Sequence, residues 1–205
     1  MPPLTKDDLK ILSQLNTPQK IQDFLDELPQ NNEDKGETCM SPARVLLEKK
    51  AHCIEGAMLA AVAIWLQGEK PLIMSLKVAH GDDDHIIALY KVNGYWGAIS
   101  KTNHAVLRFR DPIYRTPREL ALSYYHEYFL TSNGKKTMVG YSRPVNLRRF
   151  GTNWVVAEND LWELGNAIYT MDHIPVVPKG NERYIRNAHP LEREAASIKE
   201  WEVKN

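Results

Sequence analysis

An uncharged stretch from Gly56 to Leu66 constrains the fold of this chain more than any other feature. It belongs to the segment AHCIEGAMLAAVAIWLQG, in which a helix is predicted to begin at Cys53 and to end near Gly68. A helix that is apolar on every face normally lies buried at the centre of a domain. The rest of the chain must therefore supply the layers that cover it.

A β-hairpin is predicted after this helix. Residues 71–78 form a first predicted strand, and two further apolar runs flank Asn93-Gly94. Asn-Gly between apolar runs is the strongest short hairpin signal, because both residues tolerate a positive φ. A two-residue loop would pair Val92 with Tyr95, which places Ser100 beside His85 on one face of the sheet.

Flanking helices complete the expected fold. Thr5 with Asp8, and later Thr17-Pro18, mark the starts of two helices within residues 5–28. We expect residues 1–35 to form an N-terminal helical segment. Residues 36–205 would then form an α+β domain with a C-terminal extension, in which the buried helix packs on an antiparallel sheet. A strand is also expected at 105–110, followed by a loop that begins at Asp111-Pro112.

Composition excludes several classes of partner. Basic and acidic residues each number 26, so the formal net charge is zero. Without a basic excess or a block of like charge, we expect neither nucleic acid nor a membrane surface as a partner. The longest apolar run is too short to span a bilayer, and the first residues lack the plan of a signal peptide, so a cytoplasmic protein is expected.

No metal or cofactor is indicated by the sequence. The two cysteines cannot build a disulfide framework. The Asp82-Asp83-Asp84 run follows a glycine and is more typical of a solvated turn than of a calcium or magnesium site. We therefore expect no cofactor and no metal ligand.

Cys53 and His85 have the residue types of a thiol nucleophile and its base. A thiol attacks as its thiolate, which is favoured by a helix N-terminus and by a nearby imidazolium. N–H groups at the same helix end can hold the oxyanion of a tetrahedral intermediate. His52 is not expected to act as the base, because adjacent helix residues point apart.

The residue that orients His85 stays open. Ser100 and Thr102 would lie beside it, whereas Asn103 would need a bulge. A carboxylate is the usual orienting group, and none lies on that side of the hairpin. Asp111 could reach His85 only from the loop that follows.

This order of elements resembles the transglutaminase-like superfamily, which includes bacterial cysteine peptidases and amidases as well as protein cross-linking enzymes with a papain-like Cys-His arrangement. The resemblance runs from Ser41 to Pro112 and implies Cys53 as nucleophile and His85 as base, with Trp96 on the third strand. The family pattern usually has an aspartate four positions after that tryptophan. Here Ser100 stands at that position, and an Asp-Pro pair comes eleven residues later.

The third member of the catalytic triad is therefore open. It is Asp111, or a neutral group from Ser100 or Asn103, or it is missing. The sequence predicts thiol-dependent acyl transfer or hydrolysis at an amide or ester bond, on a peptide, a protein or a small molecule. Cys53 would attack the carbonyl, and His85 would take the thiol proton and later protonate the leaving group. The alternative is a non-catalytic domain of the same fold that binds a peptide or a protein partner.

Overall fold

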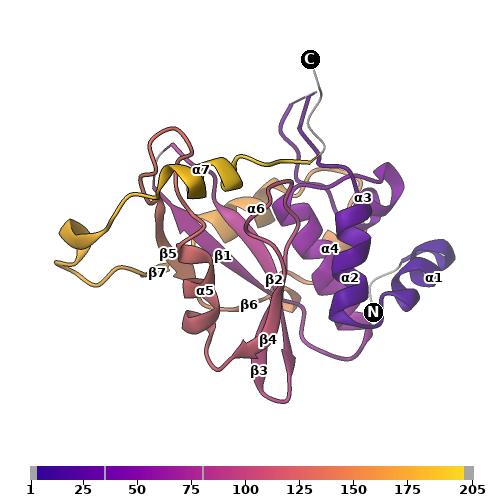
Figure 1. Ribbon diagram of the computed structural model, residues 1–205. Helices are drawn as coiled ribbons and strands as arrows, with labels where there is room; N and C mark the ends of the chain where they lie inside the picture. The colour runs from indigo at the N-terminus through magenta and orange to yellow at the C-terminus, as the bar shows by residue number, and fades with distance from the viewer. Residues whose placement is uncertain (1–3, 35, 80, 201–205) are drawn as a thin grey trace.

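The computed structural model describes residues 4–34, 36–79 and 81–200. In chain order its helices and strands are α1 (Lys6–Gln14), α2 (Pro18–Glu27), α3 (Pro42–Glu48), α4 (Cys53–Leu66), β1 (Leu72–Val78), β2 (His85–Val92), β3 (Tyr95–Ile99), β4 (Arg110–Tyr114), α5 (Pro117–Tyr125), β5 (Met138–Ser142), β6 (Val145–Asn146), η1 (Leu147–Phe150), η2 (Asn153–Val155), α6 (Trp162–Tyr169), β7 (His173–Pro175), η3 (Glu182–Tyr184) and α7 (Pro190–Ala196) (Figure 1).

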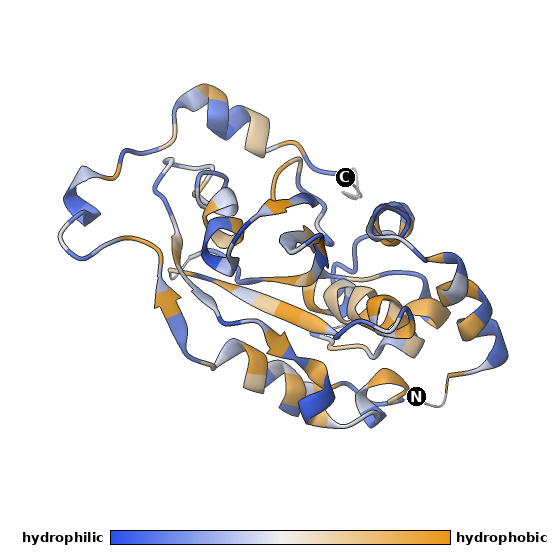
Figure 2. Ribbon diagram, turned by 90° about the horizontal axis from the view of Figure 1, so that it is seen from below, coloured by the Kyte–Doolittle hydropathy of each residue, from blue (hydrophilic) through white to orange (hydrophobic). Residues whose placement is uncertain are grey.

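An antiparallel sheet with helices on both faces forms the core, which confirms the α+β prediction. The strand order is β4-β3-β2-β1-β5-β7, and β6 pairs with β1. Side chains alternate across the strands, so Ile73 and Ile86 pack with α4, whereas Met74 and Ile87 pack with α5 on the other face. Figure 2 shows hydrophobic residues concentrated in the central strands and helices, and hydrophilic residues along much of the outer loops.

Helix α4 is the buried helix that the sequence predicts. Every residue from Ile54 to Ile64 is buried, including the carboxylate of Glu55. The helix lies against β1 and β2 on one side and against α1, α2 and α3 on the other. At its N-terminal end, Cys53 is only partly buried. Burial on all sides explains why this segment carries no charge after its first turn.

The hairpin forms in the predicted register. Asn93 and Gly94 both have a positive φ, 50° and 86°, as a type I′ turn requires. Val92 pairs with Tyr95, and the ladder continues to Ala88 opposite Ile99. The next residue along β3, Ser100, therefore reaches the neighbourhood of His85 at the start of β2.

The two N-terminal helices belong to the same hydrophobic core as α4. Their caps form as predicted, with Thr5 accepting a hydrogen bond from the Asp8 amide and Thr17 one from the Lys20 amide. Ile21 and Leu25 of α2 have no exposed surface. Removal of α2 would thus uncover one side of the buried helix.

Truncation of Leu25 tests this shared core. We expect Leu25→Ala to lower the free energy of unfolding by about 2–5 kcal/mol, the usual cost of a cavity at a fully buried leucine. Leu47→Ala is the matched control, because Leu47 on α3 is 80% exposed and should change stability by less than about 0.5 kcal/mol. Urea unfolding followed by tryptophan fluorescence measures both. Two separate transitions in the parent protein would contradict a single core.

Two predictions for the region after the hairpin are wrong. The strand expected at 105–110 begins instead at Arg110, and residues 105–109 form a loop in which Leu107 has a φ of 64°. Asp111, expected to begin a loop, is the second residue of β4. The loop is held by long-range contacts: the Leu107 amide donates to Glu127, and the Ala105 amide donates to the carbonyl of Ile198. Such contacts leave no local sequence pattern.

The C-terminal extension contains the short helix α7, which ends at Ala196, and residues 201–205 lie outside the described part. Within the described residues, no helix combines the length and the apolar character needed to cross a membrane.

Candidate active site

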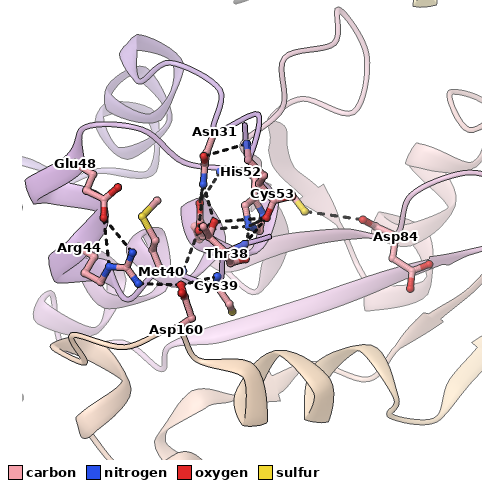
Figure 3. A network of polar contacts seen from close by, with 12 residues as sticks. Asn31, Thr38, Cys39, Met40, Arg44, Glu48, His52, Cys53, Asp84 and Asp160 are labelled. Carbon is pink, nitrogen blue, oxygen red and sulfur yellow. Dashed lines mark hydrogen bonds and ion pairs between the residues drawn. The ribbon is translucent and has the colours of Figure 1, made fainter. Parts of the chain in front are cut away.

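Cys53 is the first residue of α4, with His52 as the N-cap. The cap has an extended backbone, with φ −101° and ψ −173°, so the chain enters the helix at a sharp angle. The Sγ atom of Cys53 lies 3.9 Å from the carbonyl oxygen of Asp84, in the loop between β1 and β2 (Figure 3). The thiol thus faces the end of the sheet where β2 begins.

His85, the first residue of β2, lines the same cavity as Cys53 and is anchored by Ser100. Its Nε2 lies 2.7 Å from the hydroxyl of Ser100. That hydroxyl donates its own proton to the carbonyl oxygen of Leu107, at 2.5 Å. Ser100 can therefore only accept from His85, so the ring carries its proton on Nε2 and leaves Nδ1 to exchange a proton with the sulfur.

Ser100 is fixed in turn by Gln22 of α2. The side-chain oxygen of Gln22 accepts from the Ser100 amide at 2.9 Å, and its side-chain nitrogen donates to the Ser100 carbonyl at 2.8 Å. Both residues are buried. The N-terminal helices thus help to position the site, a role that the sequence does not reveal.

Of the sequence candidates for orienting His85, Ser100 is the one that the structure brings to the ring. Asp111 is exposed on β4 and is not among the residues that line the site cavity. The Thr102 hydroxyl accepts from the amide of His104, and the Asn103 carbonyl accepts from the amide of Glu200. The geometry therefore favours a neutral hydroxyl behind His85.

A second histidine, which sequence reasoning set aside, also lies at the site. His52 precedes Cys53 directly and lines the same cavity. The rule that adjacent residues point apart holds inside a helix, but His52 is the N-cap and its backbone is extended. The signal available in the sequence was the spacing of His52 and Glu55, because an N-cap and its third following residue commonly bond to each other. The His52 amide does donate to Glu55, at 2.9 Å.

Glu55 is a buried carboxylate that accepts hydrogen bonds from Asn31, Thr38 and Met40, three residues labelled in Figure 3. Its side chain has no exposed surface. One oxygen accepts from the hydroxyl of Thr38 at 2.8 Å and from the amide of Met40 at 2.9 Å. The other accepts from Asn31 at 3.1 Å. These donors hold a carboxylate charge beneath the first turn of α4, close to the ring of His52.

The electrostatics of the site favour a thiolate. Burial by itself raises the pKa of the Cys53 thiol, but hydrogen bonds from His52 and His85, together with their charges, lower that pKa to about 5. Tyr169 of α6 lines the same cavity, and burial, followed by the negative charge of Cys53, raises the pKa of its phenol. The phenol therefore stays un-ionised at neutral pH. Cys39, in contrast, is buried, which raises the pKa of its thiol to about 12.

An open cavity of about 960 Å³ runs over these residues. His52, Cys53, His85 and Tyr169 all line it. Its walls come from the segment after α2, the β1–β2 loop, the loop after β3, and the residues after α5. A cavity of this size can hold a peptide segment or a small acyl compound around the sulfur.

The aspartates of the β1–β2 loop are engaged with protein groups. Asp84 accepts from Lys77 at 2.6 Å and from the Val78 amide at 2.9 Å, and Asp82 accepts from the hydroxyl of Thr137. Within residues 4–34, 36–79 and 81–200, no group of three or more His, Cys, Asp or Glu side chains could hold a metal ion.

Comparison with known proteins identifies no family for this chain. No protein-family model matches the chain, and a search of curated proteins gives no match.

Proposed function

We propose that the protein is a thiol-dependent acyl-transfer enzyme or hydrolase that acts on an amide or ester bond. Cys53 is the nucleophile, His85 is the proton carrier, and Ser100 orients His85. The observation that carries this proposal is the position of the Cys53 sulfur, 3.9 Å from the carbonyl oxygen of Asp84 and on the same cavity as the next residue, His85, whose ring is anchored to a buried hydroxyl. A nucleophile, a base and a third group that orients the base are the usual parts of a thiol active site.

In this mechanism the thiolate forms a bond to the carbonyl carbon, and the carbonyl electron pair moves onto oxygen. N–H groups in the first turn of α4 lie beside the sulfur, where they are placed to stabilise the oxyanion. The leaving nitrogen or oxygen departs with a proton from an imidazolium beside the sulfur. Water then attacks the thioester and gives a proton to His85, and the thiolate is released. Hydrolysis is the simpler outcome, and an amine in place of water would give transfer.

Two further features support this chemistry. Both cysteines are free thiols, as a reducing compartment such as the cytoplasm would keep them. The order of a helix opened by Cys53, a strand, a strand opened by His85 and a strand with Trp96 supports a relationship to the transglutaminase-like superfamily. We include that relationship in the proposal.

The pH dependence of Cys53 alkylation tests the proposal. Because the pKa of the thiol is lowered to about 5, the rate constant for reaction with iodoacetamide should change less than about threefold between pH 6 and pH 8. An ordinary thiol with a pKa near 8.5 loses about a hundredfold in thiolate over the same interval. Peptide mapping by mass spectrometry assigns the label to its cysteine.

Cys39 is the control within the same chain, because its buried thiol should stay unlabelled while the protein is folded. A tenfold fall in the Cys53 rate for each pH unit below 8 would contradict the proposal. That outcome would favour a non-catalytic domain that binds a peptide or a protein in the same cavity.

A further inference from the structure

Two histidines line the cavity together with the Cys53 sulfur, and the groups behind them differ. The Nε2 atom of His52 lies 3.0 Å from the carbonyl oxygen of Thr38, 3.4 Å from a carboxylate oxygen of Glu55 and 3.6 Å from one of Glu33. All three neighbours are acceptors, so Nε2 must carry a proton. The other nitrogen, Nδ1, is therefore the one that can accept a proton from Cys53.

Charge distinguishes the two imidazoles. Behind His52 stands the buried carboxylate of Glu55, held by donors from Asn31, Thr38 and Met40. Behind His85 stands the neutral hydroxyl of Ser100. A carboxylate stabilises an imidazolium far more than a hydroxyl does, because it adds a full negative charge in a buried environment. The proton shared by the three groups should thus rest on His52.

We propose that His52 is a second catalytic histidine, which takes the proton of Cys53 at rest and holds the sulfur as a thiolate, with Glu55 as its positioning residue. The S–H bond breaks, an N–H bond forms at Nδ1 of His52, and the electron pair stays on sulfur. This inference rests on the proposed thiol chemistry and assigns its first proton transfer.

The arrangement divides the work between the two rings. Acylation removes the negative charge from sulfur, so His52 loses a stabilising partner and its proton becomes available to the leaving group. The Nδ1 atom of His85 still carries no proton, so it can then accept the proton of the attacking water. After release of the thiolate, that proton returns to His52 through the sulfur. Each cycle consumes one amide or ester and one water, and it produces an acid with an amine or an alcohol.

The surrounding ionisable groups agree with this assignment. Burial by itself lowers the pKa of His52, but its hydrogen bond to Cys53, the thiolate charge and Glu55 raise that pKa to about 9. Besides these, Glu33 faces the ring from the segment after α2. The sulfur also meets His85 from β2 and Tyr169 from α6, and Asp84 lies beside it in the β1–β2 loop.

Titration of the thiolate in four proteins tests the proposal. Ultraviolet absorbance of the thiolate is followed from pH 4 to pH 9 in the parent chain, His52→Asn, His85→Asn and Glu55→Gln, with the Cys53→Ser spectrum subtracted. We expect His52→Asn to raise the titration midpoint by about 1–3 pH units, the effect of losing an adjacent positive charge. Asparagine is a favoured N-cap, so the start of α4 should be kept. Glu55→Gln should raise the midpoint by less, because it acts through His52.

A second measurement follows the His52 ring directly. Nitrogen-15 chemical shifts of the His52 ring in the parent chain at pH 7 should show an imidazolium, and Cys53→Ser should move its titration to lower pH. Two results would overturn this inference and leave the proposed function standing. One is a neutral His52 ring at pH 7. The other is a thiolate midpoint that folded His52→Asn leaves unchanged and His85→Asn raises. A midpoint near that of an ordinary thiol in the parent chain would instead remove the proposed function.

Discussion

Ser100→Ala is expected to raise the titration midpoint of the Cys53 thiolate by about 1–2 pH units, because the His85 ring loses the group that orients it. The same substitution should lower the free energy of unfolding by about 1–3 kcal/mol, the cost of leaving a buried donor and a buried acceptor without a partner. The donor is Nε2 of His85, which is 6% exposed, and the acceptor is the carbonyl of Leu107. Absorbance titration and urea unfolding measure the two effects.

Asp111→Asn is the matched control for Ser100→Ala. Asp111 is exposed on β4 and lies away from the cavity, so its substitution should leave both the midpoint and the stability unchanged. The reverse result, with Asp111→Asn raising the midpoint and Ser100→Ala leaving it in place, would show that the carboxylate orients His85 in solution.

Gly56→Ala should destabilise the fold by about 1–3 kcal/mol or more, through overpacking. A β-carbon at Gly56 would lie 2.4 Å from Cβ and 3.0 Å from Cγ of Lys101. Lys101 is 1% exposed and follows Ser100 directly, so it has little room to move. The new methyl group would push α4 away from the chain segment that carries Ser100, and we expect a raised thiolate midpoint as well as lower stability.

Gly165→Ala on α6 is the control for that substitution. There a new β-carbon would meet the sulfur of Cys39 at 3.3 Å, a contact with a single side-chain atom of the described residues. Alanine is also favoured over glycine inside a helix by about 1 kcal/mol. Thermal unfolding should therefore show little change or a small gain for Gly165→Ala and a clear loss for Gly56→Ala. An unchanged stability of Gly56→Ala would mean that helix α4 is free to shift.

The sequence predicts the site in part. The buried helix opened by Cys53 and the Asn93-Gly94 hairpin could be predicted because each depends on residues that are close in the chain. The hairpin register then placed Ser100 beside His85, and the hydrogen bond between them agrees with that register. Asp111 was a weaker candidate, since a loop of unknown course had to carry it back to the ring, and the chain pairs it into β4 instead.

His52 shows where the sequence rule failed. The expectation that neighbouring side chains diverge applies to residues with helical backbone on both sides. The extended backbone of an N-cap lets its ring lie alongside the first helical residue. A helix that begins at Cys53 makes His52 its N-cap, so the rule for residues inside a helix was applied one position too early, at a helix end, where sequence patterns are least certain.

The sequence by itself determined the elements and the pairing of neighbouring strands, because apolar periodicity and turn chemistry act over a few residues. Only the tertiary structure decided which groups surround the sulfur. Thr38 and Met40 donate hydrogen bonds to Glu55, close to the ring of His52. Gln22 of α2 bonds to Ser100, which lies 78 residues later in the chain. These contacts depend on how α2 and α4 pack against the sheet, a property of the whole core that no short segment encodes.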